Sequence, residues 1–403
     1  MIKIKHNIPR IGHAIYILLL IIVLAVASWA QQYKDTNDNQ TIDTTGFIDS
    51  THHWYDIYDE DKVITPSPHQ PRYKINQIVE ISDNILLYQK LNGGWPKNYD
   101  MLAILTEEQK YSLQKVKEKT NTTFDNGATH SQIHYLAKAY TATKIGRFKA
   151  GCLRGIDFIL AAQYPNGGFP QFFPDTSGYR KYITFNDGAM IGVMKVLHDI
   201  IQNKPWYSFV DSFTRIKVLQ AFDKGVECIL KCQIIQHSKL AGWSQQHDNV
   251  NFRPQGARTF EPAALGGEES ADIVRFLMSL ENPSLEIISA IQTAVKWLKE
   301  SQIYGIRVET IEAPAMVYKY STSKIDRVVV EDPKAVPIWA RLYELGTNKP
   351  LFCNRDGIPV YSLAEVERER RSGYSWYTYE PDRVFKEYPK WQKKWAPDNN
   401  ELK

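Results

Sequence analysis

The chain has 403 residues, of which 43% are hydrophobic and 23% are charged, and this composition excludes a largely disordered protein. A formal net charge of +4, from 49 Lys and Arg against 45 Asp and Glu, gives no support for a nucleic-acid partner. Four cysteines are too few for a disulfide framework.

The N-terminus has the pattern of a secretory signal peptide. Basic residues precede an apolar run over residues 14–27, which is shorter than the roughly 20 residues that span a bilayer. Small residues follow at Ser28 and Ala30, where a signal peptidase would cut. We therefore expect residues 1–30 to be removed and the protein to be secreted or periplasmic, without stable membrane insertion. The alternative is an uncleaved N-terminal anchor.

The composition and periodicity of the sequence change at about residue 75. Residues 31–74 are polar and rich in Asp, Asn and Thr, and we expect them to form an extended lead-in. Beyond them the sequence has helical periodicity that is interrupted by Gly and Pro turns.

A first internal repeat pairs QKLNGGWP at residues 89–96 with QYPNGGFP at residues 163–170. Each copy follows an apolar run. A Gly-Gly turn ends a helix, and the proline prevents the helix from restarting. We expect the aromatic residues between them, Trp95 and Phe169, to fill the space between helices.

A second repeat pairs TFDNGA at residues 123–128 with TFNDGA at residues 184–189, and TFEPAA at residues 259–264 is a weaker third copy. Two helices in each period of roughly 70 residues predict stacked helical hairpins. We therefore predict a mainly α fold, in which about three hairpins over residues 75–284 close into an α/α toroid. Residues 285–403 are expected to add a further helix and a smaller, partly β region that completes a cleft.

In such a toroid the inner helices start at the same rim, so Asp125, Asp187 and Glu261 should converge there. Each Asp taken alone fits a helix N-cap, which stabilises a helix by about 1 kcal/mol. As a repeated Asp-Asn and Asn-Asp pair on one rim, these residues offer the oxygen ligands that suit Ca²⁺.

Two further groups of residues have a possible role in binding. The cluster GWSQQHD at residues 242–248 offers His247 as a base or ligand, but no zinc-binding motif accompanies it. Arginines recur along the second half of the chain, and Arg suits bidentate capture of carboxylates, although solvated surface charge explains some of them. Arg258 differs because it opens the third copy of the repeat, on the same rim as the two Asp turns.

Six motifs, in order along the chain, resemble those of the family 10 polysaccharide lyases, which are pectate lyases. They are WPK at 95–97, TFDNGAT at 123–129, FNDG at 185–188, QHD at 246–248, ARTFEP at 257–262 and ERRSGY at 369–374. The resemblance covers about residues 75–395. It implies an α/α toroid with an additional, partly β domain, and Ca²⁺-assisted β-elimination of de-esterified polygalacturonate. We expect the protein to act on this acidic polysaccharide as a monomer.

Carried over position by position, the resemblance also implies roles for single residues. Asp125, Asn126 and Asp187 match the calcium site, and Arg258 matches the arginine that removes the C5 proton of the uronate. The residues that match or are expected to bind substrate are Arg341, Arg355, Arg370, Trp243 and His247. The register leaves Arg371 as an alternative to Arg370.

An arginine is an awkward base because its pKa exceeds about 12. We expect nearby positive charges to lower the pKa of Arg258, and we expect an alkaline optimum. Two other functions stay open from the residues: an inverting glycoside hydrolase that uses two carboxylates on an α/α ring, and a non-catalytic protein that binds acidic polysaccharide.

Overall fold

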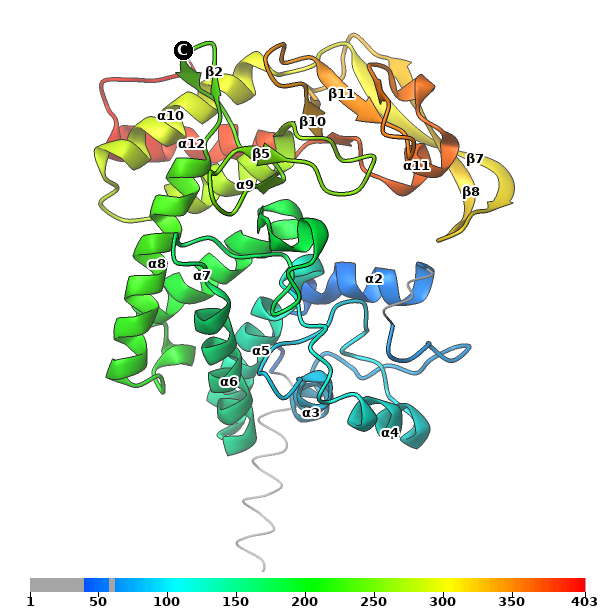
Figure 1. Ribbon diagram of the computed structural model, residues 1–403, viewed down its shortest axis with the longest axis vertical. Helices are drawn as coiled ribbons and strands as arrows, with labels where there is room; N and C mark the ends of the chain where they lie inside the picture. Colours follow the sequence, from blue (N-terminus) through cyan, green and yellow to red (C-terminus); the bar gives the residue numbers. More distant parts are fainter. Residues whose placement is uncertain (1–39, 58–61, 403) are drawn as a thin grey trace, which may run out of the picture.

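The computed structural model describes residues 40–57 and 62–402 (Figure 1). The expected signal peptide, residues 1–30, lies outside these ranges. Within them, no helix combines the length and the apolar character that crossing a membrane requires.

The largest part of the structure is an array of paired helices (Figure 1). Helix α5 packs on α6, α7 on α8, and α9 on α10, while α5 also contacts α7, and α7 contacts α9. At one end α3 packs on α5, and at the other end α12 packs on α9. The bounds are α3 (Ile78–Tyr88), α5 (His130–Thr143), α6 (Gly146–Ala162), α7 (Ala189–Ile201), α8 (Ser212–Cys232), α9 (Gly267–Met278), α10 (Leu285–Glu300) and α12 (Pro381–Trp395).

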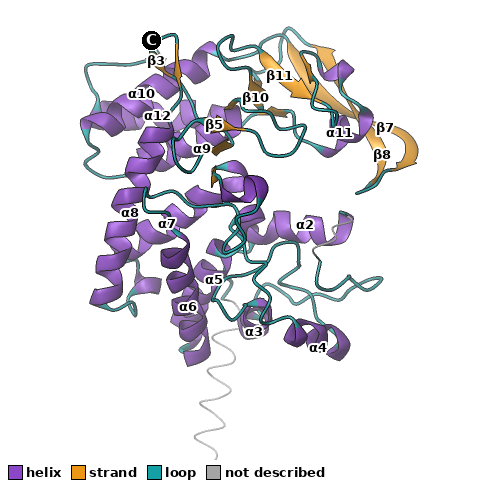
Figure 2. Cartoon of the chain, in the orientation of Figure 1, coloured by secondary structure: helices purple, strands orange, loops and turns teal. Residues whose placement is uncertain are grey.

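The prediction of a mainly α toroid is wrong. Figure 1 places α3 and α12 at opposite ends of the molecule, so the array is open. Helices make up 45% and strands 15% of the described residues, and the strands form several small sheets (Figure 2). A sequence repeat indicates that its units stack, but closure depends on the rotation between successive units, which side-chain packing sets and the period does not record.

The two Gly-Gly turns explain the first repeat. Gly93 and Gly167 have φ values of +94° and +92°. A Cβ atom on Gly93 would lie 2.3 Å from the carbonyl oxygen of Arg154 in α6, and one on Gly167 would lie 2.0 Å from that of Lys224 in α8. Glycine is therefore required at both turns, for the left-handed backbone and for close approach to the next helix. The aromatic side chains at positions 95 and 169 are fully buried, as expected.

The strands gather mainly in the C-terminal part of the chain. Strands β7 (Ile306–Val317) and β8 (Thr322–Glu331) form a long antiparallel hairpin. A four-stranded sheet has the order β12-β11-β10-β6, and it pairs Leu342 with Gly266. Its strands are β6 (Leu265–Gly266), β10 (Leu342–Tyr343), β11 (Pro350–Cys353) and β12 (Pro359–Val360). A small second core beneath these strands includes Phe260, Phe352 and Trp376.

Shorter elements complete the fold. A three-stranded sheet has the order β1-β4-β5, and two pairs join β2 with β3 and β9 with β13. The strand bounds are β1 (Ile183–Thr184), β2 (Ile235–Gln236), β3 (Lys239–Leu240), β4 (Gln246–His247), β5 (Pro254–Gln255), β9 (Trp339–Ala340) and β13 (Tyr377–Thr378). The remaining α-helices are α2 (Ile48–Asp56), α4 (Glu107–Lys115) and α11 (Arg368–Gly373). The 3-10 turns are η1 (Thr45–Phe47), η2 (Asp125–Gly127), η3 (Gly178–Lys181), η4 (Asn186–Gly188), η5 (Pro205–Tyr207) and η6 (Leu363–Glu365).

Helix α2 lies within the segment expected to be an extended lead-in. Its Trp54 side chain is fully buried, and the indole N–H donates to a backbone carbonyl at 3.0 Å. The hydroxyls of Thr51 and Tyr55 donate to the buried carboxylate of Asp100 at 3.3 and 3.2 Å. These contacts hold α2 against the helical array.

Candidate active site

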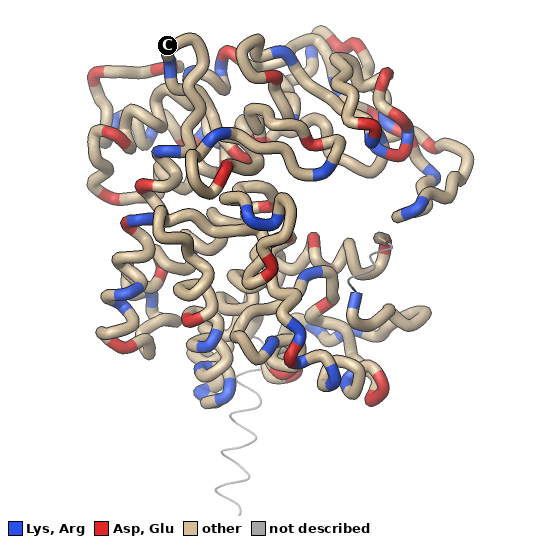
Figure 3. Tube along the Cα trace, in the orientation of Figure 1, with Lys and Arg blue, Asp and Glu red and all other residues tan. Residues whose placement is uncertain are grey.

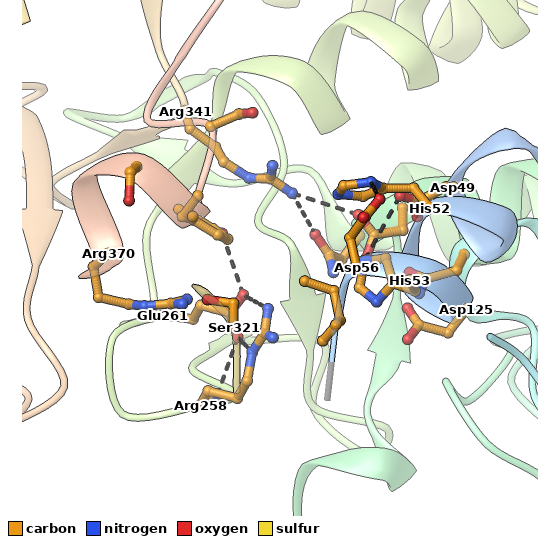
Figure 4. A pocket seen from close by; sticks show the side chains of 18 of the residues that line it. Asp49, His52, His53, Asp56, Asp125, Arg258, Glu261, Ser321, Arg341 and Arg370 are labelled. Carbon is orange, nitrogen blue, oxygen red and sulfur yellow. Dashed lines mark hydrogen bonds and ion pairs between the residues drawn. The ribbon is translucent and has the colours of Figure 1, made fainter. Parts of the chain in front are cut away.

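A single cleft of about 450 Å³ collects residues from distant parts of the chain (Figure 4). Its lining includes the turns η2 and η4, the loop before β6, the tip of the β7–β8 hairpin, α11 and one face of α2. Elsewhere, charged residues of both signs are spread along the chain (Figure 3). The cleft is thus the place where charged and amide side chains from both halves of the sequence meet.

Two equivalent turns supply the carboxylates. Asn126 in η2 has a φ of +50°, and Asp187 in η4 has a φ of +51°. Asn and Asp tolerate this left-handed backbone better than other residues that carry a Cβ, which explains why the repeat contains an Asp-Asn or Asn-Asp pair. The two turns contact each other. The repeat therefore brings Asp125 and Asp187 into one corner of the cleft.

The two carboxylates have different electrostatic environments. Asp125 is buried, and it accepts from the Lys97 ammonium at 2.6 Å and from the Gln171 amide at 2.9 Å. Burial raises the pKa of Asp125, but Lys97 and these hydrogen bonds outweigh it and hold the pKa below its ordinary value. For Asp187, burial and the nearby charge of Asp125 raise the pKa well above the ordinary value, although Arg341 opposes them.

This corner offers oxygen donors suited to a hard cation. The buried side-chain oxygens Oε1 of Gln171 and Gln246 have no hydrogen-bond partner within the described residues. Across residues 40–57 and 62–402, no group of three or more His, Cys, Asp or Glu side chains is arranged to hold a metal ion. The chemistry of the oxygens in this corner, two carboxylates and two amides, suits calcium, but Lys97 occupies the Asp125 carboxylate in this structure.

The opposite side of the cleft is basic. Arg258 donates to Glu261 through both Nε, at 2.7 Å, and Nη2 (Figure 4). Tyr374 donates its hydroxyl to the same carboxylate at 3.2 Å. Burial lowers the pKa of Arg258, but Glu261 outweighs burial, and the net effect raises it. The expectation that neighbouring positive charges lower this pKa is thus wrong for the structure as it stands, because the nearest charge is a carboxylate.

Arg341 and Arg370 also line the cleft, and each is held by an acceptor and an aromatic ring. The buried Arg341 donates from Nη2 to Oδ1 of Asn186 at 2.8 Å, and its guanidinium lies 4.6 Å from the centre of the Tyr374 ring. Arg370 donates from Nε to Glu369 at 2.7 Å and lies over Phe260 at 4.6 Å. Cation–π contacts of this kind fix a guanidinium without using up all its donors.

Other residues named from the sequence lie elsewhere. Arg355 is outside the cleft lining. Its Nε donates to Glu369 at 2.8 Å, the same carboxylate that Arg370 contacts, and its guanidinium lies over the Tyr320 ring. Arg371 pairs with Asp326, so Arg370 is the member of the pair that reaches the cleft.

Within the cluster at residues 242–248, Gln246 lines the cleft, whereas Trp243 and His247 have structural roles. Trp243 is fully buried, and its indole donates to the carbonyl oxygen of Ile229 at 2.7 Å. His247 is fully buried as well, and its Nε2 accepts from the backbone N–H of Ser244 at 3.0 Å. Neither side chain lines the cleft.

Sequence reasoning also missed cleft residues. Lys97 lies within a quoted motif, but its role as the counter-ion of Asp125 depends on tertiary contact. The polar face of α2 was overlooked, although a signal exists: Asp49, His52, His53 and Asp56 have the i, i+3, i+4, i+7 spacing of one helix face.

Comparisons with known proteins identify the family of the chain. The family model described as pectic acid lyase matches residues 89–385. Two solved structures of a family 10 polysaccharide lyase from Cellvibrio cellulosa are similar, each with a TM-score of 0.66 and covering 78% of this chain and 92% of the other. One, at 28% identity, is described as the lyase alone, and the other, at 27%, as a mutant in complex with trigalacturonic acid. No curated protein matches the chain. On the family match, which spans most of the sequence, the chain belongs to the pectic acid lyase family and is an enzyme of the pectate lyase class.

Proposed function

We propose that the enzyme is exported and cleaves de-esterified polygalacturonate by Ca²⁺-assisted β-elimination. The observation that carries this proposal is the meeting of three arginines, Arg258, Arg341 and Arg370, with the carboxylates of Asp125 and Asp187 in one cleft. A polymer of uronates presents one carboxylate per sugar, and guanidinium groups are suited to binding it. The similar lyase described in complex with trigalacturonic acid supports this class of substrate.

The arginines of the cleft have different roles. Arg341 and Arg370 bind uronate carboxylates and stabilise the negative charge that grows on the carboxylate as the adjacent C–H bond breaks. Asn186 and Tyr374 fix the orientation of Arg341, and the carboxylates of Asp187, Glu268 and Glu269 lie 3.5–3.9 Å from its guanidinium.

Arg258 acts as the base. It takes the proton from C5, the electrons of that bond form the C4–C5 double bond, and the C4–O4 bond breaks with O4 taking a proton from solvent. The guanidinium must lose its own proton first, and its ion pair with Glu261 opposes that loss. Substrate binding has to loosen this pair, and alkaline pH favours the neutral base.

The residues that would hold calcium are Asp125, Asn126 and Asp187. Lys97 pairs with Asp125 in this structure, so calcium would have to displace that ammonium, whereas Asp187 keeps a carboxylate beside it. Bound Ca²⁺ would place a fixed positive charge beside the substrate carboxylate.

The test is the absorbance of the unsaturated product. Polygalacturonate incubated with the enzyme and Ca²⁺ should give rising ultraviolet absorbance, because elimination leaves a double bond conjugated with the carboxylate. A chelator should stop the rise, and added Ca²⁺ should restore it. Chain cleavage without absorbance would show hydrolysis and overturn the proposal, and activity that is indifferent to chelation would remove calcium from it.

A further inference from the structure

Helix α2 forms a wall of the cleft that lies outside the region matched by the family model, which begins at residue 89. Its polar face presents Asp49, His52, His53 and Asp56 to the cavity. In Figure 4 these four side chains group on one side of the cavity, while Arg258, Glu261 and Arg370 lie on the other. The cleft therefore has a basic wall, and opposite it a wall of carboxylates and imidazoles.

The opposite face of α2 is anchored, so the polar face is held in place. Phe47 at the helix N-cap and Trp54 are buried. The Ser50 hydroxyl accepts from the backbone N–H of Tyr99 at 3.2 Å, and Thr51 donates to Asp100. Positions 47, 50, 51 and 54 thus mirror the i, i+3, i+4, i+7 spacing of the cleft face. A wall held in this way can position a ligand rather than follow it.

The acceptors on this wall are only partly used within the protein. His52 lies 2.9 Å from Oδ2 of Asp56, and no hydrogen bond to Oδ1 is present among the described residues. Asp49 lies 3.7 Å from His53, which is beyond hydrogen-bond length. Their side chains are 51% and 63% exposed at positions 49 and 56, so they can meet a ligand in the cleft.

The chemistry of these groups does not match a uronate carboxylate. Asp49 and Asp56 would repel it, whereas carboxylate oxygens accept readily from neutral hydroxyls, and a neutral imidazole can donate or accept. Each galacturonate unit has one carboxylate and free secondary hydroxyls. A sugar lying between the two walls is best satisfied with its carboxylate toward the arginines and its hydroxyls toward α2.

We propose that α2 is a hydroxyl-reading wall, which orients the uronate chain by accepting hydrogen bonds from its secondary hydroxyls through Asp49 and Asp56. This inference rests on the proposed function, because it takes polygalacturonate as the ligand. It assigns a positioning role, so the wall acts on substrate affinity and on discrimination against sugars whose hydroxyls are blocked.

The test compares polygalacturonate with the same polymer carrying acetyl esters on its secondary hydroxyls. The wild-type enzyme should cleave the acetylated polymer with a clearly lower kcat/KM. In the Asp49→Ala, Asp56→Ala double variant, KM for the unmodified polymer should rise about 10- to 100-fold with kcat nearly unchanged, as expected for loss of a hydrogen bond to a charged group. The ratio of kcat/KM between the two polymers should fall to near one.

Two further variants make the test specific. Asp49→Asn with Asp56→Asn keeps an oxygen acceptor at both positions, so it should retain most of the discrimination. If this variant behaves like the double alanine, negative charge rather than hydrogen bonding is at work, and the hydroxyl-reading role is refuted. Glu107→Gln on α4 removes a carboxylate that is 89% exposed and does not line the cleft, and it should match the wild type.

Failure of this inference is separable from failure of the proposed function. If the wild type releases unsaturated product but the double alanine variant keeps its KM and its discrimination, only the role of α2 is overturned. If the wild type releases no such product, the proposed function itself fails. Thermal unfolding of each variant at the wild-type temperature establishes that the fold is intact, as expected for side chains more than half exposed.

Discussion

The two sides of the cleft are built in different ways. The carboxylate corner comes from two copies of one turn, η2 and η4, whose left-handed residues Asn126 and Asp187 fix the side chains through the local backbone. The basic wall comes from unrelated loops and short elements. Its arginines are fixed by acceptors and rings, such as Glu261 for Arg258 and Phe260 for Arg370.

This difference has a chemical consequence. A carboxylate that is positioned by its own backbone is available to a cation without any rearrangement, and the Asp187 side chain is 30% exposed. An arginine held by a protein carboxylate must exchange that partner, at least in part, for the substrate. The basic wall is therefore already neutralised before substrate arrives, which limits non-specific binding of other anions.

The largest effect is expected at the centre of the basic wall. Arg258→Ala should lower kcat by about 10²- to 10⁴-fold, the range for loss of a general base, while trigalacturonic acid still binds. The absorbance assay gives kcat, and calorimetry gives the affinity. Arg258→Lys should be nearly as inactive, because an ammonium cannot replace the fork of donors that Glu261 holds. A variant that loses binding but keeps kcat would move Arg258 from chemistry to recognition.

The next effect tests the carboxylate corner. Asp187→Asn removes one of two anionic ligands proposed for calcium, and the Ca²⁺ concentration needed for half-maximal activity should rise by about 10- to 100-fold, as for loss of a metal-site interaction. Direct calcium binding provides a readout apart from catalysis. Asp83→Asn, at an exposed ion pair with Arg147 outside the cleft, is the matched control and should leave calcium dependence unchanged.

The pH dependence of kcat tests the proposed role of Arg258 as the base. The net pKa of Arg258 is raised, so only a small fraction of the guanidinium is deprotonated near neutral pH, and that fraction grows about tenfold for each pH unit. With calcium saturating, kcat should therefore rise with pH throughout the range in which the enzyme stays folded. A bell centred near neutral pH would show that another group limits the reaction.

The carboxylate corner could be found from the sequence because its signal is local and repeated. An Asp-Asn or Asn-Asp pair before Gly is a turn that needs a left-handed residue, and two copies in step with a helical period face the same way. The basic wall was located through resemblance, since nothing local tells Arg370, which reaches the cleft, from Arg371, which pairs with Asp326.

Burial and assembly explain the rest. Trp243 and His247 sit in a polar stretch, but tertiary packing encloses both, and sequence alone does not record which side of a turn faces the core. The prediction that the helical array closes into a ring was wrong for a similar reason. The rotation between successive hairpins depends on many side-chain contacts. Helix α2 was hidden by its composition: polar residues around one buried tryptophan read as a loop unless their spacing is examined.

The smallest effect sharpens the account of the basic wall. Glu369 pairs with both Arg355 and Arg370, and although burial alone would raise it, these two arginines lower its pKa to about 2. The depressed pKa means that the stability from this cluster is fully present above the ordinary pKa of a glutamate and is lost only as the pH falls toward 2.

Glu369→Gln should therefore act equally at all working pH values. It frees the nearly buried Arg370, which is 9% exposed, and the partly exposed Arg355, and KM for polygalacturonate should change by only about 2- to 5-fold because the ring of Phe260 still holds Arg370. If Glu369 mainly orients the arginines, KM rises, and if it mainly competes with the substrate carboxylate, KM falls. Since the ring of Phe260 already holds Arg370 at 4.6 Å, competition is the stronger term, and we expect KM to fall.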